Sequence, residues 1–145
     1  RLLPNSTVFD EARYFTPGSE SDPLELQSEW MDQITITDVR DGTSNTLLLG
    51  ESHVPEPELS RAPWNGPALL GRYLTHFCRV GGPGIPIAHN ARDTRASIYS
   101  FGSWHAEVCQ FAFVDGSARA LGTSISSQVL SSLCNRGDGL RFEGF

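Results

Sequence analysis

Residues 107–121, EVCQFAFVDGSARAL, constrain the fold more than any other segment of the chain. Apolar and polar side chains alternate in the first half of this segment, which is typical of a β-strand with one buried face. Asp115 and Gly116 follow, and the Asp-Gly dipeptide strongly favours a two-residue type I′ turn. We therefore predict a β-hairpin over about residues 107–121 in which Val114 lies opposite Ser117. This register places three bulky side chains opposite three small residues: Cys109, Phe111 and Phe113 opposite Gly122, Ala120 and Ala118.

A short helix is predicted directly after the hairpin, over about residues 124–134. Thr123 or Ser124 can cap its first turn, and Gly137 marks its end. Its apolar residues recur at helical spacing along one stripe: Ile125, Val129, Leu130 and Leu133. A hairpin followed by a helix, with many long loops before them, predicts a β-rich α+β fold with an antiparallel sheet.

Two shorter elements are predicted before the hairpin. Ile34 and Ile36 alternate with polar residues and predict a short strand, with a helical turn through Asp38 as the alternative. Residues 46–51, TLLLGE, predict a second strand. Because its apolar run is continuous, we expect a central strand that is covered on both faces.

The remaining segments are rich in glycine, proline and other turn formers. Residues 1–30, 54–67 and 81–96 are predicted to be irregular. Residues 69–78 fit either a strand or a helix, and the pattern does not choose between them. Residues 97–101, SIYSF, predict a short strand. The length of 145 residues predicts one globular domain.

Charge is distributed unevenly along a chain whose net charge is −6. Residues 1–66 carry twelve of the seventeen acidic residues, whereas residues 67–145 carry seven of the eleven arginines. This distribution argues against a nucleic-acid-binding protein, which normally presents a basic stripe. It permits head-to-tail contact between oppositely charged faces of neighbouring copies. No apolar run approaches the roughly 20 residues that span a bilayer.

His105 and Asp115 are the polar residues that flank the first strand of the hairpin. An extended strand rises about 3.3 Å per residue, so its two ends lie roughly 25 Å apart. The two side chains therefore cannot form a catalytic dyad. Asp115 is expected to shape the turn, and His105 to anchor the loop that leads into the strand.

Two motifs together resemble a known family. Trp104 and His105, nine intervening residues, then Asp115 and Gly116 form a W-H-x9-D-G-S-x-R pattern, and residues 36–51 read ITDVRDGTSNTLLLGE. Both are similar to the motifs of a pilin-like family, found in many paralogous copies in planctomycete-type bacteria and long described as a domain of unknown function. The resemblance marks four further motif residues in the second segment: Asp41, Gly42, Asn45 and Glu51.

The family resembles type IV pilins and the pseudopilins of type II secretion. It implies a small β-rich head outside the cytoplasm, preceded by a prepilin leader and a long apolar helix. The chain is accordingly expected to be the exported head alone, with membrane attachment only through a helix outside it. The implied role is non-enzymatic assembly with like subunits or secretion machinery. Ala106, Glu107 and Val108 depart from the family pattern, in which Pro-Gly-Gly follows the histidine.

Several side chains are candidates for ligand binding. No cofactor is expected; Asp38, Asp41 and Asn45 could offer oxygen atoms to calcium, but a role in bracing the turn also explains them. Glu51 and His53 would share a strand face and could bind a metal ion together, although solvation at the end of the strand also explains them. The alternative function is a polysaccharide- or cation-binding surface formed by two tryptophans and two loop residues: Trp64, Trp104, His89 and Asp93. The tryptophan rings could instead pack their loops onto the core.

No pattern of catalytic residues is recognised. The sequence has no G-x-S-x-G motif, and no histidine spacing requires a transition-metal site. Cys109 falls on the apolar face of its predicted strand, and such surroundings raise the pKa of a thiol and lower its reactivity. Cys78, Cys109 and Cys134 leave the disulfide pairing open.

Overall fold

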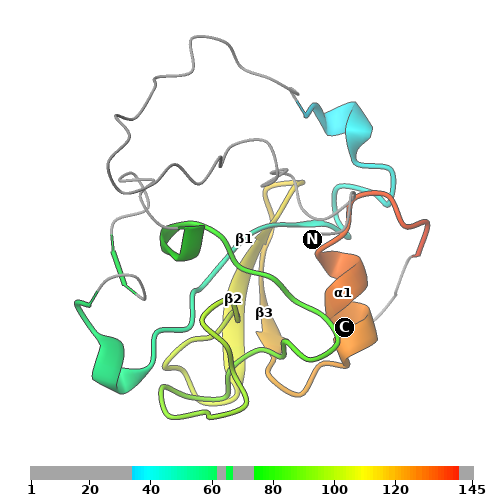
Figure 1. The fold of residues 1–145 in the computed structure, drawn as a ribbon. Helices are drawn as coiled ribbons and strands as arrows, with labels where there is room; N and C mark the ends of the chain where they lie inside the picture. Colours follow the sequence, from blue (N-terminus) through cyan, green and yellow to red (C-terminus); the bar gives the residue numbers. More distant parts are fainter. Residues whose placement is uncertain (1–33, 62–64, 67–73, 141–145) are drawn as a thin grey trace, which may run out of the picture.

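The structure is a computed structural model, and it describes residues 34–61, 65–66 and 74–140. Predictions for residues 1–33 and 67–73, and for Trp64, lie outside the described residues. The elements in chain order are η2 (Ile36–Asp38), β1 (Leu47–Gly50), η3 (Glu56–Glu58), η5 (Leu74–His76), β2 (Val108–Phe113), β3 (Ala118–Gly122) and α1 (Ser127–Leu133) (Figure 1). Within these residues, no helix has the length and apolar character needed to cross a bilayer.

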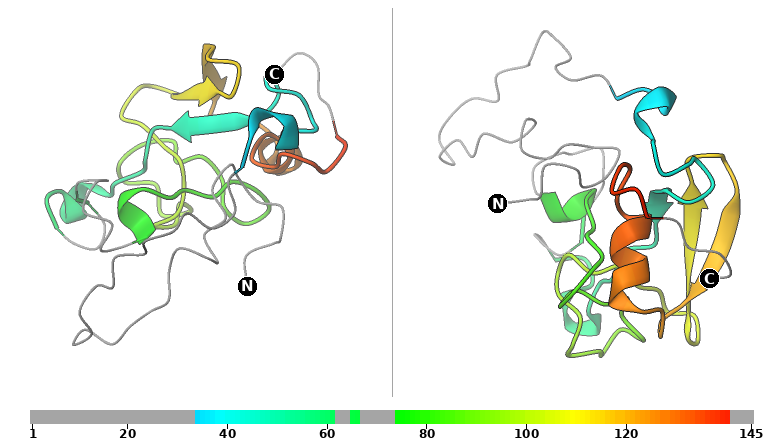
Figure 2. Two further views of the ribbon diagram at one scale, coloured as in Figure 1. Left: turned by 90° about the horizontal axis from the view of Figure 1, so that it is seen from above. Right: turned by 90° about the vertical axis from the view of Figure 1, so that its right-hand side faces the viewer.

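A three-stranded antiparallel sheet, in the order β1-β2-β3, organises the described part of the chain. Every second residue of β2 is buried: Cys109, Phe111 and Phe113 are at most 2% exposed. In the right-hand view of Figure 2, α1 and the loop segments lie on one side of the hairpin, and its other side faces outward. The prediction of a β-rich α+β fold, with a hairpin followed by a short helix, is therefore confirmed.

The hairpin closes one residue away from the predicted register. Ala112 pairs with Ala118, and the Phe113 N–H donates to the Ser117 carbonyl at 2.9 Å. The Gly116 N–H donates to the Phe113 carbonyl at 3.0 Å and Gly116 has φ +84°. The connection is therefore a three-residue loop with a glycine in the left-handed region, and the predicted two-residue type I′ turn is wrong.

Contacts with the segment before β1 explain this register. The Val114 N–H donates to the Thr46 carbonyl, and the Asp115 N–H donates to the Thr43 carbonyl, each at 3.0 Å. Val114 therefore has no N–H left for the predicted pairing with Ser117. The turn chemistry of Asp-Gly is compatible with both loops, so the hydrogen bonds to Thr43 and Thr46 decide between them.

The shift also changes which side chains face one another. Phe111 lies opposite Arg119, and Cys109 lies opposite Leu121, so the predicted pairing of bulky with small residues is wrong. The Arg119 guanidinium lies over the Phe113 ring, 4.4 Å from its centroid. This cation–π contact covers the buried face near the turn, where the ring would otherwise meet water.

β1 is an edge strand of this sheet, and the prediction of a central strand is wrong. Leu47 is 5% exposed, whereas Leu49 is 62% exposed. The register with β2 shifts between these two leucines, which is a bulge-like irregularity. An apolar run thus predicted the strand correctly but not its covering, because both faces are covered only where other elements pack on them.

Two other predicted strands are absent from the described residues. Residues 36–38 form the 3-10 helix η2, the alternative to a strand, and Asp38 accepts the Thr35 N–H at 2.8 Å. Residues 97–101 contribute only an isolated bridge, between Phe101 and Ser52. Turns and side-chain hydrogen bonds compete with strand pairing in both segments.

α1 packs against the buried face of the sheet. Ser126 caps it by accepting the Val129 N–H at 3.2 Å, and Leu130 and Leu133 are each 1% exposed. A Cβ atom on Gly81 would lie 2.6 Å from Leu130 Cγ, so glycine allows the loop to approach the helix closely. The core around α1 consists of Leu47, Ile87, Phe101, Cys109, Phe111, Phe113, Leu121, Leu130, Leu133 and Cys134.

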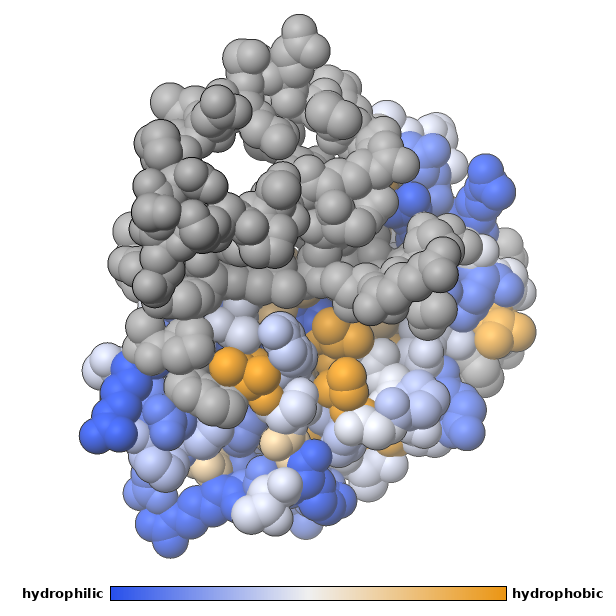
Figure 3. All heavy atoms as spheres, in the orientation of Figure 1, coloured by the Kyte–Doolittle hydropathy of each residue, from blue (hydrophilic) through white to orange (hydrophobic). Residues whose placement is uncertain are grey.

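The surface over this core is mixed in character. On the face shown in Figure 3, hydrophobic side chains of the coloured residues gather near the centre and hydrophilic ones occupy much of the rim. The large apolar side chains exposed in the described residues include Ile36, Leu49 and Trp104, at 70%, 62% and 63%.

Candidate functional site

Glu51 connects the two motif segments. One carboxylate oxygen accepts the Gln110 N–H at 2.7 Å, and the other lies 3.5 Å from His105 Nε2. The Glu51 N–H also donates to the Gln110 carbonyl at 3.2 Å. The side chain therefore continues the pairing of β1 with β2 beyond Gly50, and it brings the histidine of the second motif to the end of the first.

The loop before β2 is held at several points. Buried Ser103 donates its hydroxyl to the Val108 carbonyl at 2.6 Å and accepts the His105 N–H at 3.1 Å. At the start of the loop, the Gly102 N–H donates to the Glu51 carbonyl at 3.0 Å. Side-chain and backbone bonds thus fix the position from which His105 reaches Glu51.

Asp115 has its own partners at the turn end of the hairpin. Its carboxylate accepts the Ser117 N–H at 2.8 Å and lies 3.8 Å from the Arg119 guanidinium. The hydrogen bonds from Ser117, with a smaller contribution from Arg119, hold the pKa of Asp115 below its usual range. His105 and Asp115 therefore contact different residues, and β2 separates them.

Asp41 joins the first motif to the segment after α1. Its side chain is 2% exposed, and its two oxygens accept the N–H groups of Asp138 and Gly139, each at 2.8 Å. Gly42 follows with φ +97°, and its carbonyl accepts the Asn45 N–H at 2.9 Å. The Asp-Gly pair of this motif thus forms a turn and a clamp at the same time.

The three calcium candidates are already engaged in hydrogen bonds. Asp38 accepts the N–H and hydroxyl of Thr35, Asp41 accepts the two amides described above, and Asn45 donates its side-chain N–H to the Asp41 carbonyl at 3.4 Å. In the described part of the chain, no group of three or more His, Cys, Asp or Glu residues could hold a metal ion. The geometry therefore favours the bracing role for these side chains.

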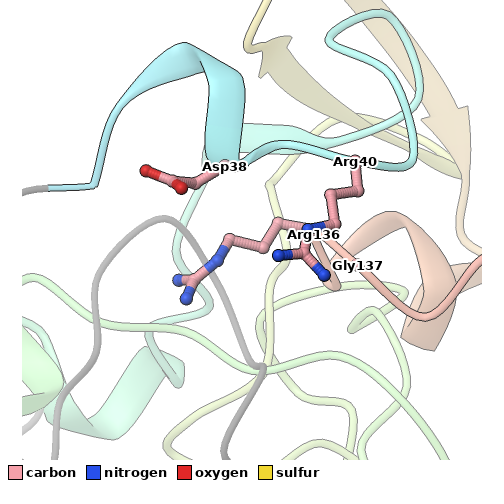
Figure 4. Close-up of a pocket in the computed structure, with 4 residues that line it drawn as sticks. All are labelled: Asp38, Arg40, Arg136 and Gly137. Carbon is pink, nitrogen blue, oxygen red and sulfur yellow. The ribbon is translucent and has the colours of Figure 1, made fainter.

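Asp38 also lines a small polar hollow of about 140 Å³ together with Arg40, Arg136 and Gly137 (Figure 4). The hydrogen bonds from Thr35 are the main cause that lowers the pKa of Asp38, and the two arginines add to it. The Arg40 N–H donates to the Arg136 carbonyl at 2.7 Å, so this hollow lies where the first motif meets the end of α1.

The match to known families covers most of the chain. A family model described as "Protein of unknown function (DUF1559)" matches residues 5–128, which include both motifs. The chain belongs to this family. No curated protein and no solved structure matches the chain.

The segment after His105 in this DUF1559 protein contains an unusual backbone conformation. Glu107 has φ +59°, in the left-handed region that favours glycine. The Pro-Gly-Gly that the resemblance implies after the histidine would place a glycine at this position. The Glu107 carbonyl accepts the Thr123 N–H at 2.9 Å, which ties the loop to the end of β3 and holds this conformation.

Glu51 and His53 do not converge as the predicted metal-ligand pair. Glu51 faces His105, whereas His53 is 4% exposed, and the charges of Asp93 and Arg79 influence its pKa in opposite directions. Burial is the main cause that lowers the pKa of His53. The strand that was expected to align the pair ends at Gly50.

His89 and Asp93 belong to an open hollow of about 400 Å³ in the loop after Ala88. Asp93 accepts the His89 N–H at 2.9 Å and pairs with Arg95 at 2.7 Å, which lowers its pKa well below the usual range. The hollow is lined by His89, Asn90, Arg92, Asp93, Thr94 and Arg95. Trp104 does not line it, so the structure separates the proposed sugar-contact residues.

All three cysteines are thiols. Cys109 and Cys134 are buried, and burial raises the pKa of each to about 12. A thiol with such a pKa is a poor nucleophile at neutral pH.

Sequence reasoning missed the partners of the motif residues. The amides of Gln110, Asp138 and Gly139 carry no recognisable signal, because they lie 59 to 98 residues from the carboxylates that accept their hydrogen bonds. Backbone N–H groups are present at nearly every position, so a pattern of side chains cannot single them out.

Proposed function

We propose that this DUF1559 protein is a non-enzymatic structural head domain of the pilin and pseudopilin type. It assembles with like subunits or with secretion-machinery partners outside the cytoplasm. A helix outside the described residues tethers it to the membrane. Its motif residues then serve the shape of the head rather than a reaction.

One observation carries this proposal: the carboxylate oxygens of the acidic residues in both motifs accept hydrogen bonds from backbone N–H groups. Asp41 accepts two amides after α1, Glu51 accepts the Gln110 amide, and Asp115 accepts the Ser117 amide. Charge-assisted bonds of this kind are among the stronger hydrogen bonds in proteins. They are the contacts expected of residues that hold loops in place.

The pair that comes nearest to an acid–base arrangement supports the same view. The side chains of Glu51 and His105 are 35% and 63% exposed, and Glu51 is also bound to the Gln110 amide. A catalytic pair is normally placed in a water-excluding cleft, where its charges act strongly. A surface contact that joins two loops suits an architectural role.

The assembly is tested by photo-crosslinking in the native host. The full gene, including whatever it encodes before Arg1, is expressed with a photoreactive amino acid at Leu49 or at Ile36, both exposed. Irradiated cells are fractionated, and products are identified by mass spectrometry. We expect products in the cell-envelope fraction at multiples of the subunit mass, or joined to secretion components.

The control is the same strains without irradiation. A protein recovered in the cytoplasm, or crosslinked to no like subunit or secretion component from either position, would contradict the proposal. So would turnover of a substrate by the purified protein that disappears in a folded His105→Gln variant.

A further inference from the structure

Arg79 is a charged side chain that the fold buries without a carboxylate partner among the described residues. It is 7% exposed, and burial lowers its pKa, with a smaller opposite contribution from Cys78. A guanidinium nevertheless stays protonated in proteins. A buried charge that lacks a partner is strongly destabilising. The side chain therefore needs an anion that the described part of the chain does not supply.

The guanidinium of Arg79 has one end bound and one edge unbound. Nη1 donates its two N–H groups to the carbonyls of Thr75 and Cys78, at 2.5 Å and 2.6 Å. Neither Nε, which is fully buried, nor Nη2 donates to an atom of the described residues. These two nitrogens carry parallel N–H groups, which match the two oxygens of a carboxylate or a phosphate. The unbound edge therefore has the geometry that recognises an oxyanion.

Two other arginines show what this edge binds elsewhere in the same protein. Arg92 donates from Nε and Nη2 to the two oxygens of Glu56. Arg95 donates in the same way to the two oxygens of Asp93, at 3.0 Å and 2.7 Å. Both of these side chains are more than half exposed, so water could solvate them without a carboxylate. Buried Arg79 has less water around it and gains more from a bound anion.

We propose that the Nε–Nη2 edge of Arg79 binds one oxyanion, a carboxylate or a phosphate, through two parallel hydrogen bonds. The oxyanion is either a free anion or a side-chain carboxylate of residues 1–33, which hold seven acidic residues and two arginines. The chemistry at the guanidinium is the same in both cases, and the experiment separates the two sources. This site goes beyond the structural role proposed above and does not depend on it.

The charges near Arg79 leave the site open to an anion. The charges of Arg79 and Asp93 both reach His53, where they change its pKa in opposite directions. The oxygens of Asp93 are bound to the Arg95 guanidinium and to the His89 N–H. Burial lowers the pKa of His53 below 6.5, so the imidazole is neutral near pH 7. Neither neighbour therefore compensates the charge of Arg79.

The test measures thermal unfolding in inorganic phosphate and in acetate, each compared with chloride at the same ionic strength. A free anion bound at the Arg79 edge is expected to raise the Tm of the wild-type protein by about 5 °C at saturation. Arg79→Lys keeps a positive charge but lacks the paired N–H groups, so it is expected to lose most of this rise. Arg92→Lys is the matched control, because Glu56 occupies its edge, and it is expected to keep the rise.

A second arm detects a carboxylate that comes from the chain itself. All acidic residues of the first 33 positions are replaced by their amides: Asp10, Glu11, Glu20, Asp22, Glu25, Glu29 and Asp32. If one of them occupies the edge, phosphate leaves the Tm of the wild type unchanged relative to chloride and raises that of the amide variant. If the ligand is a free anion, phosphate raises both alike. In either case the rise is expected to require Arg79.

Two results would overturn the proposal. The first is no rise with phosphate or acetate in either the wild type or the amide variant, which would leave water at the buried edge. The second is an equal rise in Arg79→Lys, because phosphate also stabilises proteins without binding to a site. If Arg79→Lys does not fold, the NMR signal of the Arg79 Nε–H decides, since it must shift with phosphate in at least one of the two proteins. Failure here leaves the crosslinking test of assembly unaffected.

Discussion

The carboxylate of Asp41 accepts the backbone N–H of Gly139 at 2.8 Å, across 98 residues of chain. Its other oxygen accepts the N–H of the preceding residue, Asp138, at the same distance. In Figure 1 the segment around Asp41 and the segment after α1 run side by side. A motif near the start of the described chain thus holds the segment that follows the last helix.

Asp41→Ala is expected to lower the free energy of unfolding by about 1–3 kcal/mol, because two charge-assisted hydrogen bonds are lost together. Urea unfolding followed by circular dichroism measures the change. Asp138→Ala is the matched control: it removes a carboxylate from the same loop but leaves both N–H groups that bind Asp41. Equal losses in the two variants would show that the clamp does not stabilise the fold.

Glu107→Gly is expected to stabilise the protein by about 0.5–1 kcal/mol. Relief of the left-handed backbone of a non-glycine residue outweighs the extra entropy that glycine loses on folding. Glu107→Ala keeps the Cβ atom and the strain, so it separates the backbone effect from the loss of charge. A Gly variant no more stable than the Ala variant in thermal unfolding would refute the explanation.

His53 is expected to make stability fall as the pH drops below 6.5, the ordinary pKa of histidine. Burial lowers the pKa of His53 in the folded state, so the unfolded chain takes up a proton first and is favoured as acid is added. Unfolding free energies between about pH 7.5 and about pH 5 isolate this effect from carboxylates, which titrate near pH 4.

The comparison for this prediction is between His53→Gln and His105→Gln. The first variant is expected to flatten the pH dependence in this window, whereas the second changes a side chain that is 63% exposed and is expected to keep it. A wild-type protein equally stable across the window would show that the charged form of His53 is tolerated in the fold.

Cys109 and Cys134 are expected to resist alkylation in the folded protein at about pH 8, since burial raises the pKa of each thiol to about 12. Cys78 is less buried and is expected to react first. Iodoacetamide labelling followed by peptide mass spectrometry measures all three. In denaturant the three rates should become similar; comparable rates without denaturant would contradict the burial of Cys109 and Cys134.

The hairpin illustrates how far local pattern reasoning reaches. The alternation over β2 and the Asp115-Gly116 dipeptide predicted the two strands of the hairpin and the position of its turn correctly. The loop length was wrong, because the Val114 N–H is bound by Thr46, a residue 68 positions earlier in the chain. No local signal indicates that a carbonyl from the segment before β1 will bind an amide of the turn.

Periodicity and turn chemistry are properties of neighbouring residues, and they therefore predicted three elements correctly: the hairpin, the strand β1 and the helix α1. The predicted cap of α1, Thr123 or Ser124, was wrong, because Ser126 caps it. The burial of a side chain, the register of two strands and the partners of a hydrogen bond depend on which distant segments meet. That is why β1 became an edge strand with Leu49 in water, and why Glu51 came to bridge Gln110 and His105. The backbone amides that donate hydrogen bonds to the motif carboxylates are chemically alike along the chain. Only packing in three dimensions therefore decides which of them are used.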